Sequence, residues 1–273
     1  EDGIWVGEEL ARRFGLPYWQ VATSATDANR FIIRLCRMAT GRNKVVAFNC
    51  NYHGSVDETQ VEFDDQGRMV PRAGVHPNAM DHDQTTRLVE FNDARALEEA
   101  LAHGDVACVL TEPVLTNTGM VPPVPGYHEA LRRLTRAYDA PLVIDETHTI
   151  STGPRGYTGA YDLAPDFFVL GKSVAGGIPV AVWGTSEGMA QRIWEVLPHF
   201  EPGQEINHFG FGGTLAGSAL QLRAIRATLE KVMTEESYRH MTAMAERFED
   251  GVRRTLEDHH LPWHVTRVGA RVE

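Results

Sequence analysis

The chain has 273 residues, 42% of them hydrophobic and 23% charged, which is the composition of an ordinary globular protein of one or two domains. Its net charge of -11 argues against a nucleic-acid-binding surface, because such a surface needs clustered basic side chains. No apolar run is long enough to span a membrane, and no signal peptide is visible.

Helical and strand patterns alternate along the chain, which is typical of an α/β protein with a mostly parallel sheet. The opening stretch EDGIWVGEELARRF is already helical, so we expect the natural N-terminus to be missing. Further helices are predicted at 27–40 (ended by Gly41), 94–103 (closed by Gly104), 127–138 and, interrupted near 233–237, at 214–257. Strands are predicted at 44–48, 106–111, 142–145, 167–170 and 180–183, the last as a candidate antiparallel strand. The closing stretch WHVTRVGARVE starts another strand.

The three cysteines, Cys36, Cys50 and Cys108, show no CxxC spacing and lie in apolar sequence. An odd number of such residues predicts reduced thiols in the core rather than disulfides. We therefore expect a cytoplasmic protein.

Two of the apolar runs end in charged residues. Asp145 closes the strand in APLVIDETHTISTG, and Lys172 follows the strand in FFVLGKSVAGG. Ligands of open α/β sheets bind at the carboxyl ends of the strands, so both side chains are expected in one crevice. A buried charge is costly unless it is paired or used, which makes this pair the first candidate for chemistry.

Several common motifs are excluded. VLGKS looks like the end of a phosphate-binding P-loop, but Asp166 stands where that motif requires glycine. GFGGTLAG is not a dinucleotide fingerprint, and no GxSxG elbow occurs. The histidines lack metal-ligand spacing, so no metal is expected.

Three weaker signals also lie at predicted strand ends or helix starts. TSATDAN places Ser24, Ala25 and Thr26 before a helix, where a phosphate could bind or where Ser24 or Thr26 could simply cap the helix. NYHGSVD places Tyr52 and His53 after a strand, where an ordinary turn is the simpler interpretation. Glu112 follows the strand VACVLT and, taken alone, could be a strand terminator.

Together these segments match the needs of pyridoxal 5'-phosphate. That cofactor requires a carboxylate at its ring nitrogen, a lysine amine for its aldehyde, a phosphate site and an aromatic side chain over its ring. Asp145, Lys172, the 24–26 segment and Tyr52 could supply these four groups.

At this point the sequence resembles the class III, fold-type-I aminotransferases, and within them the glutamate-1-semialdehyde aminomutase branch. The resemblance covers nearly the whole chain, in the family's order. It rests on five segments: ATSATDANRFIIRLCRMATGRNKVVAFNCNYHGS, TEPVLTNTGMVPPVPGYHEALRRL, LVIDETHTISTGPRG, FFVLGKSVAGGIPVAVWG and GGTLAGSALQLRA. It implies a mostly parallel seven-stranded sheet flanked by helices, with a large domain at 1–257 and the start of a truncated small domain at 258–273.

The resemblance also assigns roles. Lys172 would be the Schiff-base lysine, and Asp145 the partner of the ring nitrogen. Ser24, Ala25 and Thr26 would hold the phosphate, and Tyr52 and His53 would contact the cofactor, with Tyr52 stacked on the ring.

Two further roles follow from the resemblance. His148 would lie near the phenolic oxygen of the cofactor ring. An equal alternative is that His148 is a core histidine hydrogen-bonded to the backbone. Thr214, expected to open a helix, would reach the phosphate of the partner in a homodimer with shared active sites.

The motifs also depart from the family. Ser24-Ala25-Thr26-Asp27-Ala28 replaces SGTEA, and Gly217-Ser218-Ala219 replaces GNP. Ala25 in place of glycine requires a negative φ or some strain. These differences favour a divergent transaminase acting on a small amino donor and a carbonyl acceptor, in which Lys172, desolvated, moves the proton. The alternatives are an aminomutase and a non-catalytic binding protein. The substrate stays open, with Arg155 a weak candidate for binding a carboxylate.

Overall fold

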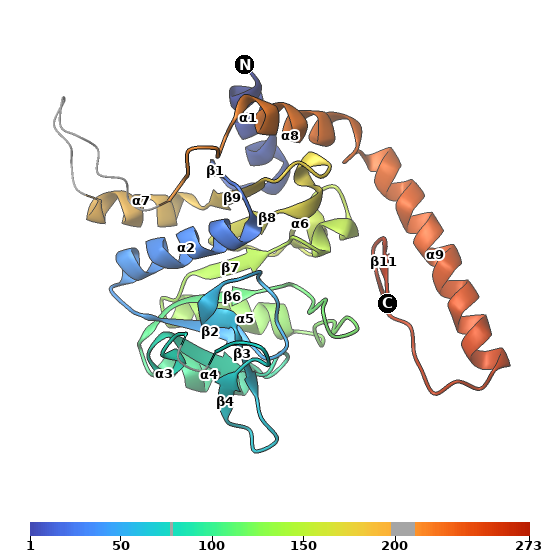
Figure 1. Ribbon diagram of the computed structural model, residues 1–273, viewed down its shortest axis with the longest axis horizontal. Coiled ribbons are helices and arrows are strands. Elements are labelled where there is room, and N and C mark those ends of the chain that lie inside the picture. The colour runs from blue at the N-terminus through green and yellow to red at the C-terminus, as the bar shows by residue number, and fades with distance from the viewer. Residues whose placement is uncertain (77–78, 198–210) are drawn as a thin grey trace.

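Seven strands form one sheet in the order β1-β9-β8-β7-β6-β2-β5 (Figure 1). This computed structural model describes residues 1–76, 79–197 and 211–273. The strands are β1 (Tyr18–Ala22), β2 (Lys44–Phe48), β5 (Thr86–Val89), β6 (Val106–Thr111), β7 (Leu142–Asp145), β8 (Phe167–Leu170) and β9 (Ala181–Thr185). Neighbours are parallel except where β9 pairs with β8 and β1. The predicted α/β class with a mostly parallel seven-stranded sheet is confirmed.

Helices cover both faces of the sheet. In β8, Phe167 and Val169 pack on one face, with α2 (Ala25–Thr40) and α7 (Glu187–Val196), whereas Phe168 and Leu170 pack on the other. That second face is covered by α1 (Asp2–Phe14) and α8 (Ala219–Lys231) at one end, and by α4 (Ala94–Ala102) and α5 (Tyr127–Ala137) towards the other. Because helices cover both faces, the central strands are apolar throughout, which is why the sequence reveals them.

The predicted strands 44–48, 106–111, 142–145 and 167–170 are confirmed with the same bounds. The predicted strand 180–183 lies at 181–185 and is antiparallel, as expected. The sheet's two edge strands, β1 and β5, were not predicted. Edge strands are partly exposed and carry polar residues such as Gln20 and Arg87, so they lack a continuous apolar run.

Most predicted helices lie where expected, with shifted ends. α2 begins at Ala25 because the side chain of Ser24 accepts a hydrogen bond from the Asp27 N–H, and it ends at Gly41 in a left-handed conformation. α4 ends at Ala102, one residue before the predicted end, and α5 ends at Ala137.

The predicted helix start at Thr214 is wrong. Thr214 lies in an exposed turn, and α8 begins only at Ala219. Gly217 has a φ of 74°, which no helix allows, and Ser218 then caps α8 by a reciprocal pair of hydrogen bonds with Gln221. The predicted interruption is present, since α9 (Glu235–Asp258) starts after the cap residue Thr234.

The remaining elements are short. They are two hairpins, β3 (Val61–Phe63) with β4 (Met69–Pro71) and β10 (Arg267–Val268) with β11 (Arg271–Val272), and the helical segments η1 (Asp57–Thr59), α3 (His82–Thr85), η2 (Thr149–Thr152), α6 (Gly156–Ala160) and η3 (Lys172–Ala175). The strand expected in the closing stretch is thus present as β10 and β11. The domain boundary at 257 stays a prediction.

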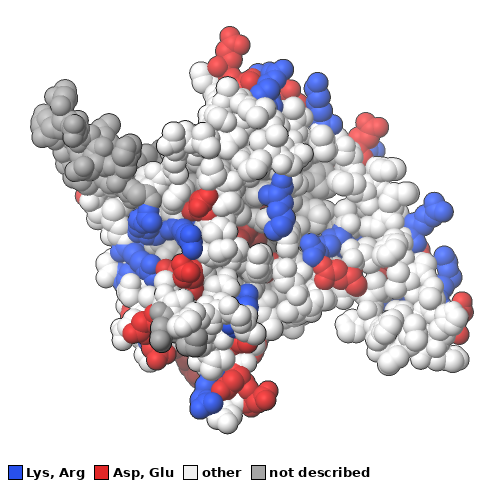
Figure 2. Space-filling view, in the orientation of Figure 1, with Lys and Arg blue, Asp and Glu red and all other residues white. Residues whose placement is uncertain are grey.

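Cys36 and Cys108 are buried free thiols, as expected, but Cys50 is exposed in the turn after β2, contrary to the prediction. No helix in the described part of the chain is long and apolar enough to cross a membrane. On the face drawn in Figure 2, acidic and basic side chains are interspersed rather than separated by sign.

Candidate active site

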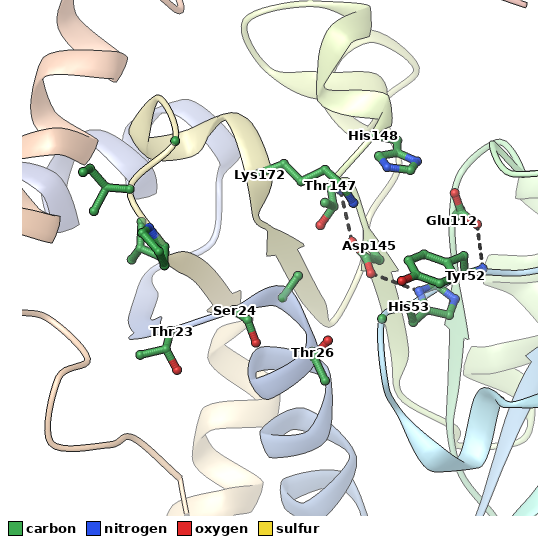
Figure 3. A pocket seen from close by; sticks show the side chains of 16 residues that line it. Thr23, Ser24, Thr26, Tyr52, His53, Glu112, Asp145, Thr147, His148 and Lys172 are labelled. Atoms are coloured by element: carbon green, nitrogen blue, oxygen red, sulfur yellow. Dashed lines mark hydrogen bonds and ion pairs between the residues drawn. The ribbon is translucent and has the colours of Figure 1, made fainter. Parts of the chain in front are cut away.

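A cavity of about 430 Å³ opens at the carboxyl edge of the sheet (Figure 3). Eight of the nine predicted site residues line it: Ser24, Ala25, Thr26, Tyr52, His53, Asp145, His148 and Lys172. They come from the ends of β2, β7 and β8 and from the start of α2. β7 and β8 are paired side by side, so Asp145 at the end of one and Lys172 just past the other meet in one crevice, as predicted.

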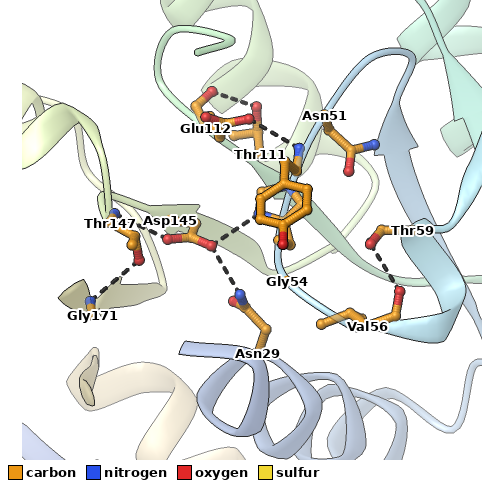
Figure 4. Close-up of polar contacts among 12 residues, drawn as sticks. Asn29, Asn51, Gly54, Val56, Thr59, Thr111, Glu112, Asp145, Thr147 and Gly171 are labelled. Carbon is orange, nitrogen blue, oxygen red and sulfur yellow. Dashed lines mark hydrogen bonds and ion pairs between the residues drawn. The ribbon is translucent and has the colours of Figure 1, made fainter. Parts of the chain in front are cut away.

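Asp145 is 4% exposed and is surrounded by hydrogen-bond donors (Figure 4). Its Oδ2 lies 2.9 Å from Nδ2 of Asn29 and 3.0 Å from Nδ1 of His53, and its Oδ1 accepts the Thr147 N–H at 3.1 Å. Burial by itself raises the pKa of Asp145, but these contacts, His53 first among them, bring it below the ordinary value. Asp145 is therefore a buried carboxylate that stays ionised at neutral pH.

No sequence motif above includes Asn29 as a site residue. It is fully buried on the face of α2 that packs on the sheet, where a polar side chain needs a partner. That signal, an amide on an apolar helix stripe, was available in the sequence.

The start of α2 forms the opposite wall of the cavity. The hydroxyls of Thr23 and Ser24 both donate to Oδ2 of Asp27, at 2.6 and 2.9 Å, so the helix-cap interpretation of Ser24 is correct. Ala25 and Thr26 lie in the first turn of α2, where backbone N–H groups have no acceptor within the helix and the positive end of the helix dipole favours an anion. Ala25 is absent from the described residues with positive φ, so it replaces glycine without backbone strain.

The loop after β2 lies tightly against α2 at Gly54. A Cβ on Gly54 would lie 2.0 Å from the hydroxyl oxygen of Thr26, and Gly54 has a φ of 74°. The next residue, Ser55, donates its N–H to the same Thr26 hydroxyl at 3.2 Å. Glycine at this position therefore lets the Tyr52–His53 segment approach the start of the helix.

Lys172 lies across the cavity from Tyr52, with its Nζ 6.0 Å from the centre of the tyrosine ring. Its φ of 42° is unusual for a non-glycine residue and is the kind of strain found at functional sites. The side chain is exposed, so the described residues do not provide the desolvation expected from the sequence.

His148 is half-buried and lines the cavity, and its ring bonds to a side chain rather than to backbone. Its Nδ1 lies 2.6 Å from the hydroxyl of Thr116, which donates to Oε2 of Glu112. Burial and then the charges of Lys172 and Arg271 lower the pKa of His148 to about 4. The imidazole is consequently neutral at physiological pH.

Glu112 also lines the cavity, so it is more than a strand terminator. It is 3% exposed, and burial raises the pKa of its carboxyl above the ordinary value. Its Oε1 accepts the Tyr52 N–H at 3.1 Å, which fixes the aromatic residue's backbone.

Two candidates from the sequence lie elsewhere. Thr214 is exposed and does not line the cavity. Arg155 lines a separate cavity beside Trp5 and contacts the carbonyl of Arg13 at 3.4 Å. Instead, Arg271 on β11 lines an adjoining cavity of about 430 Å³ that shares Thr147, His148 and Lys172 with the first. No local motif marks Arg271, because only the fold brings the end of the chain here.

The residues present fit pyridoxal 5'-phosphate. The cavity volume suits a small cofactor, with an amine, an ionised carboxylate, a helix N-terminus and an aromatic ring around it. Nε2 of His53 is buried and has no hydrogen-bond partner among the described residues. This nitrogen, on the ring that contacts Asp145, is therefore available to hydrogen-bond a ligand.

Comparisons with known proteins agree. The Aminotransferase class-III family model matches residues 5–272. A solved glutamate-1-semialdehyde-aminomutase from Pseudomonas aeruginosa PAO1, in complex with PMP, is 73% identical with a TM-score of 0.98, covering 100% of this chain and 60% of that one. An omega-transaminase from Sphaerobacter thermophilus is 25% identical with a TM-score of 0.84, covering 98% and 62%.

Curated relatives point the same way. The glutamate-1-semialdehyde 2,1-aminomutase of Halobacterium salinarum is 35% identical over 240 residues, 86% of this chain and 51% of the relative. That of Thermomicrobium roseum is 34% identical over 250 residues, 90% of this chain and 56% of the relative. The chain thus spans little more than half the length of these relatives. It belongs to the class-III aminotransferase family, and its cofactor is pyridoxal 5'-phosphate.

Proposed function

We propose that this chain forms the cofactor-binding part of a glutamate-1-semialdehyde 2,1-aminomutase. The reaction moves the amino group of an amino aldehyde from carbon 2 to carbon 1, leaving a ketone at carbon 2. For glutamate 1-semialdehyde the product is 5-amino-4-oxopentanoate, an isomer of the substrate, so no oxidant or second substrate is consumed. The proposal is carried by one observation. The cavity that holds Lys172 and Asp145 lies in a chain 73% identical to a protein of this name.

The residues of the cavity have distinct tasks in such a reaction. When bound, pyridoxal 5'-phosphate supplies an aldehyde that takes up the amino group and a ring that withdraws electrons. Asp145, ionised and held by His53, Asn29 and Thr147, would keep a proton on the ring nitrogen. The N–H groups at the start of α2 would hold its phosphate, and Tyr52 would contact its ring.

Lys172 is the residue that moves protons. When its amine is free it can take the proton from carbon 2 and deliver one to carbon 1, the transfer that an amino migration requires. Its strained backbone and its position facing Tyr52 support this role.

A second candidate is an aminotransferase with separate donor and acceptor, which the sequence motifs favoured. The departures at Ala25 and Ser218 and the likeness to the omega-transaminase support it. The named relatives favour the aminomutase over it. A non-catalytic binding protein, the third hypothesis, would have no need for Lys172 and Asp145 in the same cavity.

One experiment separates the two reactions. The full-length enzyme is incubated with glutamate 1-semialdehyde and no keto acid. The aminomutase converts it to 5-amino-4-oxopentanoate and releases no dicarbonyl compound. A panel of amino donors with pyruvate or 2-oxoglutarate provides the opposite test. Fast keto-acid-dependent turnover together with no isomerisation would overturn the proposal in favour of the aminotransferase.

The proposal includes a cytoplasmic homodimer with shared sites. Thr214 is exposed and outside the cavity of its own chain, which supports a role toward a partner's phosphate. The partners of the enzyme are otherwise its small-molecule substrates.

A further inference from the structure

Glu112, Thr116 and His148 form a continuous hydrogen-bonded chain that starts at the backbone of Tyr52 and ends in the cavity. Figure 3 shows its two ends, with the Tyr52 N–H bonded to Glu112 and His148 near Lys172. The middle member, Thr116, is 2% exposed and joins the carboxyl to the imidazole, donating to Oε2 of Glu112 and lying 2.6 Å from Nδ1 of His148. Neither Glu112 nor Thr116 has a role in the function proposed above.

While the imidazole is neutral, this hydrogen-bonded chain can carry its protons in two ways. A threonine hydroxyl has one proton and can accept with its two lone pairs. If the proton of Thr116 points to Glu112, His148 must donate from Nδ1, and its Nε2 is a bare acceptor. If Glu112 is protonated, its O–H donates a hydrogen bond to the Thr116 oxygen. The Thr116 hydroxyl must then donate to Nδ1 of His148, and the proton of the neutral imidazole lies on Nε2.

Other contacts restrict the chain to these two arrangements. Oε1 of Glu112 is occupied by the Tyr52 N–H, so Oε2 faces Thr116 in both cases. The side-chain amide of Asn117 lies 3.5 Å from the Thr116 hydroxyl and can only donate to it. Arg271 donates to the backbone carbonyl of Thr116 at 2.9 Å, which holds the threonine in place.

We propose that the protonation of Glu112 sets the tautomer of His148 through Thr116, so that Nε2 in the cavity accepts when Glu112 is ionised and donates when it is protonated. Because Nδ1 is turned to Thr116, Nε2 is the nitrogen left for a bound molecule. As an acceptor it suits an O–H or N–H group, and as a donor it suits an oxyanion. If the proposed function holds, a reaction that moves protons in both directions would use both states.

The charges around Glu112 and His148 are compatible with this change of tautomer. The charges of His53 and Asp145 act on the pKa of Glu112. Those of Lys172, Arg271, Asp145 and Glu273 act on the pKa of His148. Burial raises the pKa of Glu112, and burial with the charges of Lys172 and Arg271 lowers that of His148 to about 4, so both shifts favour the uncharged forms of the two groups. The neutral imidazole can therefore change tautomer within the range where it stays uncharged.

The test is nitrogen NMR of the full-length enzyme labelled with [15N]histidine and [13C]glutamate. The protonated and bare ring nitrogens of a neutral histidine have well-separated shifts, and the His148→Gln variant identifies the His148 signals. As the pH rises through the ionisation of the Glu112 carboxyl, the proton of His148 should move from Nε2 to Nδ1. The proposal is overturned if the tautomer is the same on both sides of that ionisation.

Glu112→Gln is the decisive variant. The glutamine must present its oxygen to the Tyr52 N–H, so its amide faces Thr116 and imitates the protonated acid. His148 should then hold its proton on Nε2 at every pH where it is neutral. Glu146→Gln, another buried acid bonded to Thr149 and the Thr158 N–H rather than to this chain, is the matched control and should leave the His148 titration unchanged.

Thr116 variants keep the proposal testable if Glu112→Gln does not fold. Thr116→Ser retains the hydroxyl and should retain the coupling. Thr116→Val has the same shape without the hydroxyl, so the His148 tautomer should no longer follow Glu112. The proposal would also be overturned if the His148 tautomer still followed the ionisation of Glu112 in Thr116→Val, because the Thr116 hydroxyl would then not be needed for the coupling.

Discussion

Nδ1 of His53 lies 3.0 Å from Oδ2 of Asp145, and both side chains are almost completely buried. An ionised carboxylate has no proton to give, so His53 must donate from Nδ1. Asn29 donates to the same oxygen, which leaves Oδ1, bonded to the Thr147 N–H, with a free lone pair for a ligand in the cavity. Oδ1 of Asp145 can therefore accept one more hydrogen bond, and the protonated ring nitrogen of the cofactor is a suitable donor.

Replacement of Asp145 by asparagine should leave the cofactor bound but reduce turnover by about 10²–10³-fold or more, because an amide cannot hold the ring proton. The measurement is kcat under saturating substrate. Glu146→Gln is the matched control, since Glu146 is equally buried but bonds to Thr149, Tyr157 and Thr158 away from the cavity. It should keep near-normal kcat. Equal losses in the two variants would mean that Asp145 acts only in folding.

Lys172→Ala should abolish turnover and the visible absorbance of the lysine-bound cofactor. This chain has three lysines, Lys44, Lys172 and Lys231, so peptide mapping can distinguish the attachment site among them. Borohydride reduction followed by peptide mass spectrometry should place the cofactor on Lys172 alone. Lys44→Ala and Lys231→Ala should still be labelled there. Label on another lysine would refute the assignment.

Gly54→Ala should weaken cofactor binding and destabilise the fold, because the new methyl group collides with the Thr26 hydroxyl. Its positive φ alone costs about 1–2 kcal/mol for an alanine. Gly67 is the control, with a φ of 72° and nothing within 4 Å of an added Cβ, so Gly67→Ala bears the backbone cost only. Urea unfolding and cofactor titration measure both effects. Identical behaviour of the two variants would show that the contact with Thr26 is unimportant.

His148 should make the protein sensitive to mild acid. Its pKa falls from 6.5 to about 4 in the folded state, so below 6.5 the unfolded chain binds a proton that the folded chain does not. Stability therefore decreases as the pH falls between these values. His148→Gln lacks this linkage, so its Tm should drop less than that of the wild type between neutral pH and about pH 4. Parallel curves of Tm against pH for the wild type and His148→Gln would contradict the lowered pKa of His148.

The shared-site prediction can be tested by mixing inactive protomers. Lys172→Ala is combined with a Thr214→Trp variant, which is expected to block phosphate binding in a partner. In a mixed dimer with shared sites, one site carries both changes and the other carries neither, so activity should return. If subunit exchange is demonstrated and the mixture stays inactive, Thr214 serves its own chain or has no role in the site.

The sequence revealed the parts of the fold and site that depend on local pattern. The central strands ending at Asp145 and near Lys172 are apolar throughout because both sheet faces are covered, and their charged ends stand out. The edge strands lack that contrast and were missed. Thr214 was placed on a helix because its neighbours have helical periodicity, which the left-handed Gly217 interrupts.

The supporting residues were harder to find, because their roles depend on partners distant in sequence. Asn29 meets Asp145 across 116 positions, and Arg271 meets Thr116 across 155. Thr116 itself looks like an ordinary loop threonine until the fold places it between a carboxyl and an imidazole. Periodicity and local motifs carry no information on such contacts.

The hairpin carrying Arg271 has a consequence for how the protein folds. α9 takes the chain about 36 Å away before it returns. The returning hairpin is secured by the Ala270 N–H on the carbonyl of Ser151 at 3.1 Å, by Gly269 packed on Thr152, and by Arg271 on Thr116. Contacts this far apart in sequence form slowly, since a long loop must close first. In refolding experiments the sheet should therefore form before the wall beside His148, and competence to bind cofactor should lag behind the recovery of secondary structure.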